Sequence, residues 1–162
     1  MTVLKVLKAV PSYFTVWNLV IVACNFVTFK YIDILLTCTI ILAVSTYMLY
    51  VRPGYFRMIL KWASSGGEKE EFYIVSGLFA NILHILLHVV PLVYVALKYG
   101  AYYRRRPLGS HTILALLLFF LYLKMVKMEE VYDVEFEHLS IVALAATAGY
   151  VVCKSVVQSL VI

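Results

Sequence analysis

Five long apolar stretches alternate along the chain with short segments that hold almost all of its charge. A helix of about 20 apolar residues crosses the ~30 Å hydrocarbon core of a bilayer. The stretches are continuously apolar and do not alternate, which favours helices over the strands of a membrane barrel. The pattern predicts an all-α polytopic membrane protein, a bundle of five transmembrane helices. The predicted spans are residues 9–29, 34–51, 74–97, 111–126 and 139–161.

The connections between these spans differ in character. Lys30–Asp33 is so short that the first two spans should form a tight antiparallel hairpin. Between Tyr55 and Trp62, basic residues four positions apart lie among aromatic and aliphatic ones, which predicts a short amphipathic helix in the membrane interface. Lys98–Ser110 combines tyrosines with an arginine triplet, a composition typical of headgroup level. The residues expected at the interface are Arg52, Arg57, Lys61, Trp62, Arg104, Arg105 and Arg106.

Composition supports a membrane protein and excludes several other classes. The chain has 162 residues, of which 64% are hydrophobic and 14% charged, whereas soluble domains carry about 25% charged residues. Five helices and their connections use most of this length, so we expect a single transmembrane domain over residues 1–162. The net charge of +5 is dispersed among the loops, so we expect the lipid bilayer as a partner and no nucleic acid. The three cysteines lie inside apolar stretches and are interpreted as packing residues.

Orientation follows from the basic residues. With five spans, eight Lys and Arg lie on the N-terminal side and five on the opposite side. The positive-inside rule therefore favours a cytoplasmic N-terminus, although the arginine triplet favours the reverse. The sequence does not indicate which membrane holds the protein.

Every span but the fourth carries a polar face. Lipid cannot satisfy polar side chains, so these faces should turn inward and pair within the bundle. Most are expected to act as contacts between helices. Lys154 should either extend to the interface or pair inside the bundle, and Ala145, Gly149 and Cys153 form a ridge of small residues. The polar faces comprise Thr15, Asn18 and Asn25; Thr39 and Thr46; Gly77, Asn81, His84, His88 and Pro91; and Ser140, Thr147, Lys154 and Gln158.

His84 and His88 are the strongest candidates for chemistry. Ionisable residues inside a membrane are rare and often functional, and a neutral histidine can act as a general base, a proton relay or a metal ligand. Pro91 cannot donate a hydrogen bond to Leu87, so the backbone should open beside His88. A hydrolase would use His84 or His88 as the base and Thr39 or Thr46 as the nucleophile, although no acid that could orient the histidine is evident in the sequence.

Metal and cofactor chemistry is not expected. A bis-histidine haem needs one ligand from each of two helices, whereas both central histidines lie on one span. A zinc site needs three or four ligands, and His84 and His88 supply two. We therefore expect no metal ion and no cofactor.

Residues Asn81–Leu92, with the sequence NILHILLHVVPL, loosely resemble the histidine-bearing helix of androgen-induced-gene-like membrane hydrolases. The resemblance implies an intramembrane threonine and histidine that cleave lipid esters. It covers about a dozen residues of one helix, the spacing from asparagine to histidine differs from that of the family, and no threonine motif matches. It therefore does not identify the chain as a member.

Three functions remain open from the sequence alone. The favoured one is a non-enzymatic subunit that helps to assemble a larger membrane complex with protein partners in the bilayer, because almost no extramembrane domain is predicted and the polar faces could contact partners. The first alternative is a lipid-modifying hydrolase or transferase that uses His84 and His88. The second is a small proton or ion carrier that uses the same pair together with Lys154.

Overall fold

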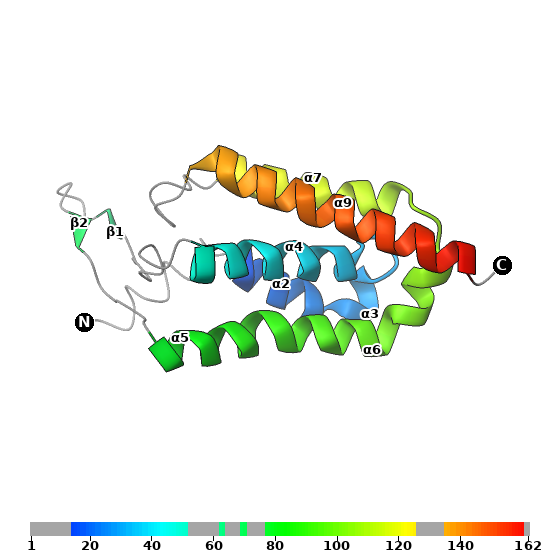
Figure 1. Cartoon of the computed structure of the whole chain (residues 1–162), viewed down its shortest axis with the longest axis horizontal. Helices are drawn as coiled ribbons and strands as arrows, with labels where there is room; N and C mark the ends of the chain where they lie inside the picture. Colours follow the sequence, from blue (N-terminus) through cyan, green and yellow to red (C-terminus); the bar gives the residue numbers. More distant parts are fainter. Residues whose placement is uncertain (1–13, 52–61, 64–68, 71–76, 126–134, 161–162) are drawn as a thin grey trace.

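The computed structural model describes residues 14–51, 62–63, 69–70, 77–125 and 135–160, and nearly all of them are helical (Figure 1). The all-α prediction is therefore confirmed for this part of the chain. In chain order the helical elements are α2 (Phe14–Ala23), α3 (Asn25–Thr28), α4 (Ile34–Thr46), the π-helix η2 (Tyr47–Val51), α5 (Gly77–His84), the π-helix η4 (Ile85–Val89), α6 (Val90–Arg105), α7 (Ser110–Met125) and α9 (Phe136–Leu160).

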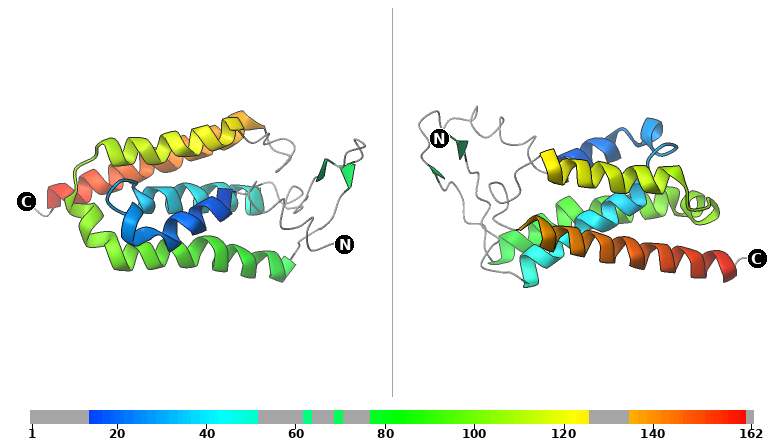
Figure 2. Two further views of the ribbon diagram at one scale, coloured as in Figure 1. Left: turned by 180° about the vertical axis from the view of Figure 1, so that it is seen from behind. Right: turned by 90° about the horizontal axis from the view of Figure 1, so that it is seen from above.

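Helix α4 lies at the centre of the bundle and contacts α2, α6, α7 and α9. In Figure 1 it runs between α7 and α9 on one side and α2 and α6 on the other. Figure 2 shows α9 along one flank, with the C-terminus at the end of the bundle where α6 and α7 meet. Ile34, Leu36 and Ile40 of α4 are fully buried. A helix surrounded by neighbours is expected to bury apolar side chains on several sides.

The hairpin predicted between the first two spans is present. Helix α2 ends at Ala23, and Asn25 at the start of α3 donates from Nδ2 to the carbonyl of Val22 at 2.6 Å. Asp33 then caps α4 by accepting a hydrogen bond from the backbone N–H of Leu36 at 3.1 Å. Aspartate favours this position because its carboxylate satisfies an N–H that has no partner within the helix.

The third helix is longer than predicted. It runs through α5, η4 and α6 to Arg105, eight residues beyond the predicted end at residue 97. Basic side chains in its last turn, Arg104 and Arg105, interact favourably with the negative end of the helix dipole. Helix α6 ends at Arg105, and the backbone of Arg106 is extended, because the residue before a proline avoids the helical conformation.

Two helices are long and apolar enough to be candidates for crossing a membrane, Asn81–Arg105 and Phe136–Leu160. The other apolar helices, Phe14–Ala23, Ile34–Tyr50 and Ser110–Met125, are shorter. The described structure is therefore an apolar helical bundle with two candidate membrane-spanning helices. This finding gives weak support to membrane association and does not by itself confirm five spans.

The prediction of an interfacial helix over Tyr55–Trp62 is wrong at its last residue. Trp62–Ala63 forms the short strand β1, which pairs antiparallel with β2 (Lys69–Glu70) and sets Trp62 opposite Glu70. The intervening sequence Ser-Ser-Gly-Gly-Glu contains residues that favour chain reversal. The remainder of the predicted helix, with Arg52, Arg57 and Lys61, lies outside the described residues.

Candidate functional site

His84 and His88 lie in a buried polar layer between α2, α4 and the third helix. Their exposed fractions are 5% and 8%. The hydroxyl of Thr15 on α2 is 3.0 Å from Nε2 of His88. The hydroxyl of Thr46 at the end of α4 is 3.4 Å from Nε2 of His84. These four residues, Thr15, Thr46, His84 and His88, are called the histidine layer below.

The backbone is distorted at this layer on both facing helices. His88 lies in η4, and the N–H of Val90 donates to the carbonyl of Ile85, five residues earlier. Pro91 explains the distortion because it has no N–H to continue the regular ladder. The second π-helix, η2, carries Tyr50, which donates to Oδ1 of Asn81 at 2.7 Å and packs edge-on against His84. Short π-helical turns occur frequently at functional sites.

The hydrogen bonds assign the proton on His88. Its Nδ1 lies 3.2 Å from the carbonyl oxygen of His84, and only a protonated nitrogen can donate to a carbonyl. Nε2 of the neutral ring is therefore an acceptor, and the Thr15 hydroxyl donates to it. Beside this pair, Nδ1 of His84 is buried without a hydrogen-bond partner, and the two histidine rings are 5.1 Å apart.

The structure revises the set of threonines predicted for this site. Thr39 is not brought to the histidines, because its hydroxyl donates to the carbonyl of Leu35 at 2.7 Å within its own helix. Thr46 does reach His84, but at the longer distance. Thr15, which the sequence placed only on a polar face, makes the shorter contact. Its partner is 73 positions away along the chain, so local spacing could not identify the pair.

The asparagines of the polar faces act as contacts between helices. Asn18 exchanges weak hydrogen bonds with the thiol of Cys38 at 3.6 Å. Oδ1 of Asn25 accepts from the Tyr99 hydroxyl and from Lys98 at 3.4 Å, which joins the α2–α3 junction to α6. These contacts satisfy buried polar groups and stabilise packing.

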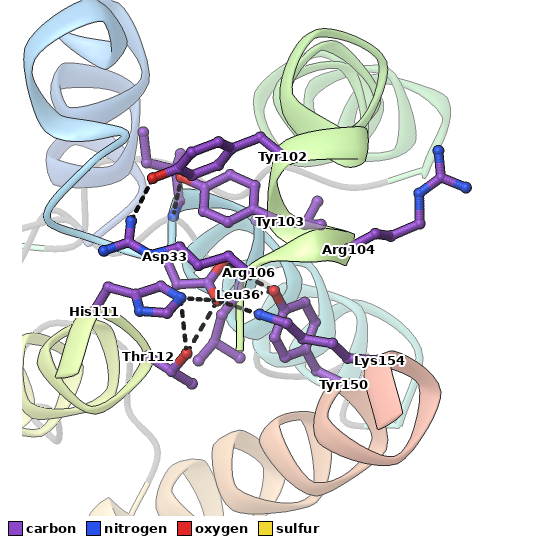
Figure 3. Close-up of polar contacts among 12 residues, drawn as sticks. Asp33, Leu36, Tyr102, Tyr103, Arg104, Arg106, His111, Thr112, Tyr150 and Lys154 are labelled. Carbon is purple, nitrogen blue, oxygen red and sulfur yellow. Dashed lines mark hydrogen bonds and ion pairs between the residues drawn. The ribbon is translucent and has the colours of Figure 1, made fainter. Parts of the chain in front are cut away.

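A second buried cluster surrounds Asp33, which is fully buried (Figure 3). The Tyr150 hydroxyl donates to its Oδ2 at 2.8 Å and the Thr112 hydroxyl does so at 3.2 Å. Lys154 Nζ and His111 Nε2 lie 3.7 and 3.8 Å from the same oxygen. The Asp33 cluster, defined as these five residues, therefore joins the start of α4 to α7 and α9.

Of the two positions predicted for Lys154, extension to the interface or pairing inside the bundle, the structure shows the second. Its exposed fraction is 5%, and its ammonium faces Asp33 inside the bundle. In the sequence, Asp33 is the one acidic residue between the first two predicted spans, and it directly precedes an apolar run. That position is typical of a helix cap. The partners on α7 and α9 could not be deduced from local pattern.

The aromatic and basic residues of Lys98–Ser110, called the collar below, divide into inward and outward residues. Tyr103 is 1% exposed and donates to the carbonyls of Phe29 and Ile32, both at 3.1 Å, so it lies in the core of the bundle. Arg106 donates from Nη1 to the carbonyl of Lys30 and to the Tyr102 hydroxyl, both at 2.6 Å. Arg104 and Arg105 are exposed, and Figure 3 shows Arg104 pointing away from the Asp33 cluster.

We expect Asp33→Asn to lower the free energy of unfolding by about 3 kcal/mol or more, because Lys154 would keep a buried charge without its counter-ion. Thermal unfolding of the purified protein in detergent measures this loss. Adding Lys154→Met to Asp33→Asn should recover part of it. Glu137→Gln, which removes an exposed acid near the start of α9, should cost less than about 1 kcal/mol. Equal losses in the two single variants would contradict a specific role for the pair.

Among the residues that the structure describes, no group of three or more His, Cys, Asp or Glu side chains could hold a metal ion. Comparisons of the chain with protein-family models, with curated proteins and with solved structures find no match. The function proposed below therefore rests on the geometry of this chain's own residues.

Proposed function

We propose that the chain is a multipass integral membrane protein whose five apolar helical segments all cross the bilayer. The outward faces of the two long helices support this. A core helix of a soluble protein is mostly buried, whereas only 22% of the apolar window in Asn81–Arg105 and 11% of that in Phe136–Leu160 are buried. Leu97 and Leu160 are 83% and 79% exposed. Such faces are unfavourable in water and compatible with lipid.

Two of the three shorter apolar helices fit this arrangement by length. Residues 34–51 form one continuous helical segment, which spans about 27 Å at ~1.5 Å per residue. Ser110–Met125 spans about 24 Å on the same basis. A helix slightly shorter than the hydrocarbon core is accommodated by local thinning of the bilayer or by flanking side chains.

Five crossings predict that the connections alternate between the two sides of the membrane. A cysteine introduced at Leu108 and a tag at the C-terminus should react with an impermeant reagent from one side. A cysteine at Ser65 and a tag at the N-terminus should react from the other. The native cysteines are first replaced by alanine. Labelling of all four positions from one side would contradict the proposed topology.

We propose further that the histidine layer is an acyl-transfer site for lipid esters, with Thr15 as the nucleophile and His88 as the general base. One observation carries this proposal: the 3.0 Å contact between the Thr15 hydroxyl and Nε2 of a histidine whose other nitrogen is held by a carbonyl. A nucleophile, a base and a group that orients the base are the parts that covalent catalysis requires. The sequence favoured an assembly subunit because almost no extramembrane domain was predicted and the polar faces could contact partners, and no acid that could orient a histidine was evident.

The chemistry follows from this geometry. His88 Nε2 takes the proton of the Thr15 hydroxyl as Oγ1 attacks the ester carbonyl carbon. The same proton then passes from Nε2 to the departing alcohol, which leaves an acyl group on Thr15. Water, deprotonated by His88, attacks this acyl group, releases the fatty acid and restores the hydroxyl. Nδ1 of His84, buried without a partner beside the pair, can donate to the oxygen that gains charge when it is the protonated nitrogen.

We expect Thr15→Val and His88→Gln each to reduce hydrolysis of a lipid ester by the purified protein about a hundredfold or more, because each removes one member of the catalytic pair. Thr39→Val is the matched control, since that hydroxyl bonds only within its own helix. A fluorophosphonate probe should add covalently to Thr15, and mass spectrometry would identify the labelled residue. Undetectable turnover of all lipid esters tested, or equal losses in Thr15→Val and Thr39→Val, would refute the proposal.

The assembly-subunit hypothesis remains a second candidate, favoured by one observation. Ala145, Gly149 and Cys153 all lie on the exposed side of α9, and a Cβ atom added to Gly149 would meet nothing within 4 Å. Ridges of small residues at spacing four allow close approach of a neighbouring membrane helix. Lys154, by contrast, belongs to the Asp33 cluster and not to the histidine layer, so the groups that the carrier hypothesis joined lie in separate parts of the bundle.

Gly149→Ile should disrupt a helix contact at this ridge while leaving the isolated bundle folded, because the side chain projects into open space. The measurement is the oligomeric state and the co-purifying proteins in mild detergent. The matched control is Val152→Ile, three residues along on the same helix. If the wild-type protein is a stable monomer without a partner, the assembly function is wrong.

A further inference from the structure

A pocket of about 340 Å³ lies at the C-terminal end of α6, lined by Ala101, Tyr102, Arg105 and Arg106. Its volume falls at the lower end of the roughly 300–1,000 Å³ typical of small-ligand sites. All four lining residues come from the last two turns of the helix and the residue that follows it. Neither the histidine layer nor the residues of the Asp33 cluster line it.

The polar side chains that line this pocket keep hydrogen-bond donors that have no acceptor among the described residues. Arg105 is exposed and has no hydrogen-bond or ion-pair partner among the described residues. Arg106 uses one nitrogen, Nη1, for the carbonyl of Lys30 and the Tyr102 hydroxyl. Because the Tyr102 oxygen accepts that bond, its own hydrogen is available to another acceptor. A pocket lined by two arginines and a tyrosine is suited to an anion with several oxygens, above all a phosphate.

The charge around the pocket also favours an anion. Six basic side chains belong to this end of the described bundle, and Asp33 is the one carboxylate among them. Asp33 is buried and already faces Lys154 and His111, so it leaves most of the positive charge unbalanced. The basic residues are Lys30, Lys98, Arg104, Arg105, Arg106 and Lys154.

An apolar stripe continues from the pocket along the outside of α6. Val93, Leu97, Ala101 and Arg105 follow one another at spacing four, so neighbouring members of this set adjoin and form one inclined ridge along the helix surface. Val93 is 48% exposed and Leu97 is 83% exposed. A ligand that joins a phosphate to a hydrocarbon chain would match this surface, with the phosphate at Arg105 and the chain along Leu97 and Val93.

We propose that this pocket and stripe form a specific binding site for an anionic phospholipid. The site rests on the proposed placement of the bundle in a membrane and does not depend on the Thr15–His88 chemistry. His88 is 17 residues from Arg105 along the same helix, about 25 Å at ~1.5 Å per residue. A lipid bound here would fix the depth of the arginine collar at one face of the membrane.

The test compares binding of phosphatidylglycerol and phosphatidylcholine by native mass spectrometry of the full-length protein released from detergent. Phosphatidylglycerol should bind about tenfold more tightly, because its phosphate keeps a net negative charge. Arg105→Gln should remove this preference. Arg104→Gln is the matched control, since Arg104 is an exposed neighbour that does not line the pocket. Equal binding of the two lipids, or equal losses in the two variants, would overturn the proposal.

A second arm separates a lipid from a free phosphate. Glycerol 3-phosphate and inorganic phosphate present the same anionic group without a chain, so neither should displace phosphatidylglycerol at an equal concentration. Leu97→Gln should weaken lipid binding several-fold because it interrupts the apolar stripe. Full displacement by either soluble phosphate, or unchanged lipid binding in Leu97→Gln, would overturn the assignment to a lipid.

Discussion

The buried carboxylate of Asp33 is the interaction on which the bundle depends. A charge in an apolar interior is stable only when it is paired and hydrogen-bonded, and Asp33 obtains its partners from three separate segments. Its own helix supplies the N–H of Leu36, α7 supplies Thr112 and His111, and α9 supplies Tyr150 and Lys154. The need to satisfy one side chain thus fixes how α7 and α9 lie against the start of α4.

The same constraint explains the distribution of polar residues elsewhere in the bundle. Each polar face meets a partner on a neighbouring helix: Thr15 meets His88, Asn18 meets Cys38 and Asn25 meets Tyr99. Large apolar side chains such as Leu97 are left on the outside. Since packing of apolar groups is not directional and hydrogen bonding is, the polar contacts select which faces of these apolar helices meet.

Whether a feature could be predicted from the sequence depends on how far apart along the chain the interacting residues lie. Helix positions and the hairpin at Lys30–Asp33 were predictable, because they depend on local apolar length. The strand at Trp62 was missed because the local amphipathic pattern favours a helix and does not reveal the pairing with Glu70. The side chains from other helices that meet Asp33 and His88 lie 73 to 121 positions away along the chain. The sequence could therefore show that these two residues need partners, but it could not identify them.

The π-helix η4 links the histidine layer to the opposite end of the bundle. His84 and Tyr103 are 19 residues apart, so at about 100° per residue they would point about 100° away from each other on a regular helix. Both are nevertheless buried in the same bundle, at 5% and 1% exposure. A π-helical turn accommodates an extra residue and so rotates the following face back. Pro91 favours this turn, and one helix can therefore present histidines to Thr15 and Thr46 while Tyr103 reaches the chain reversal before α4.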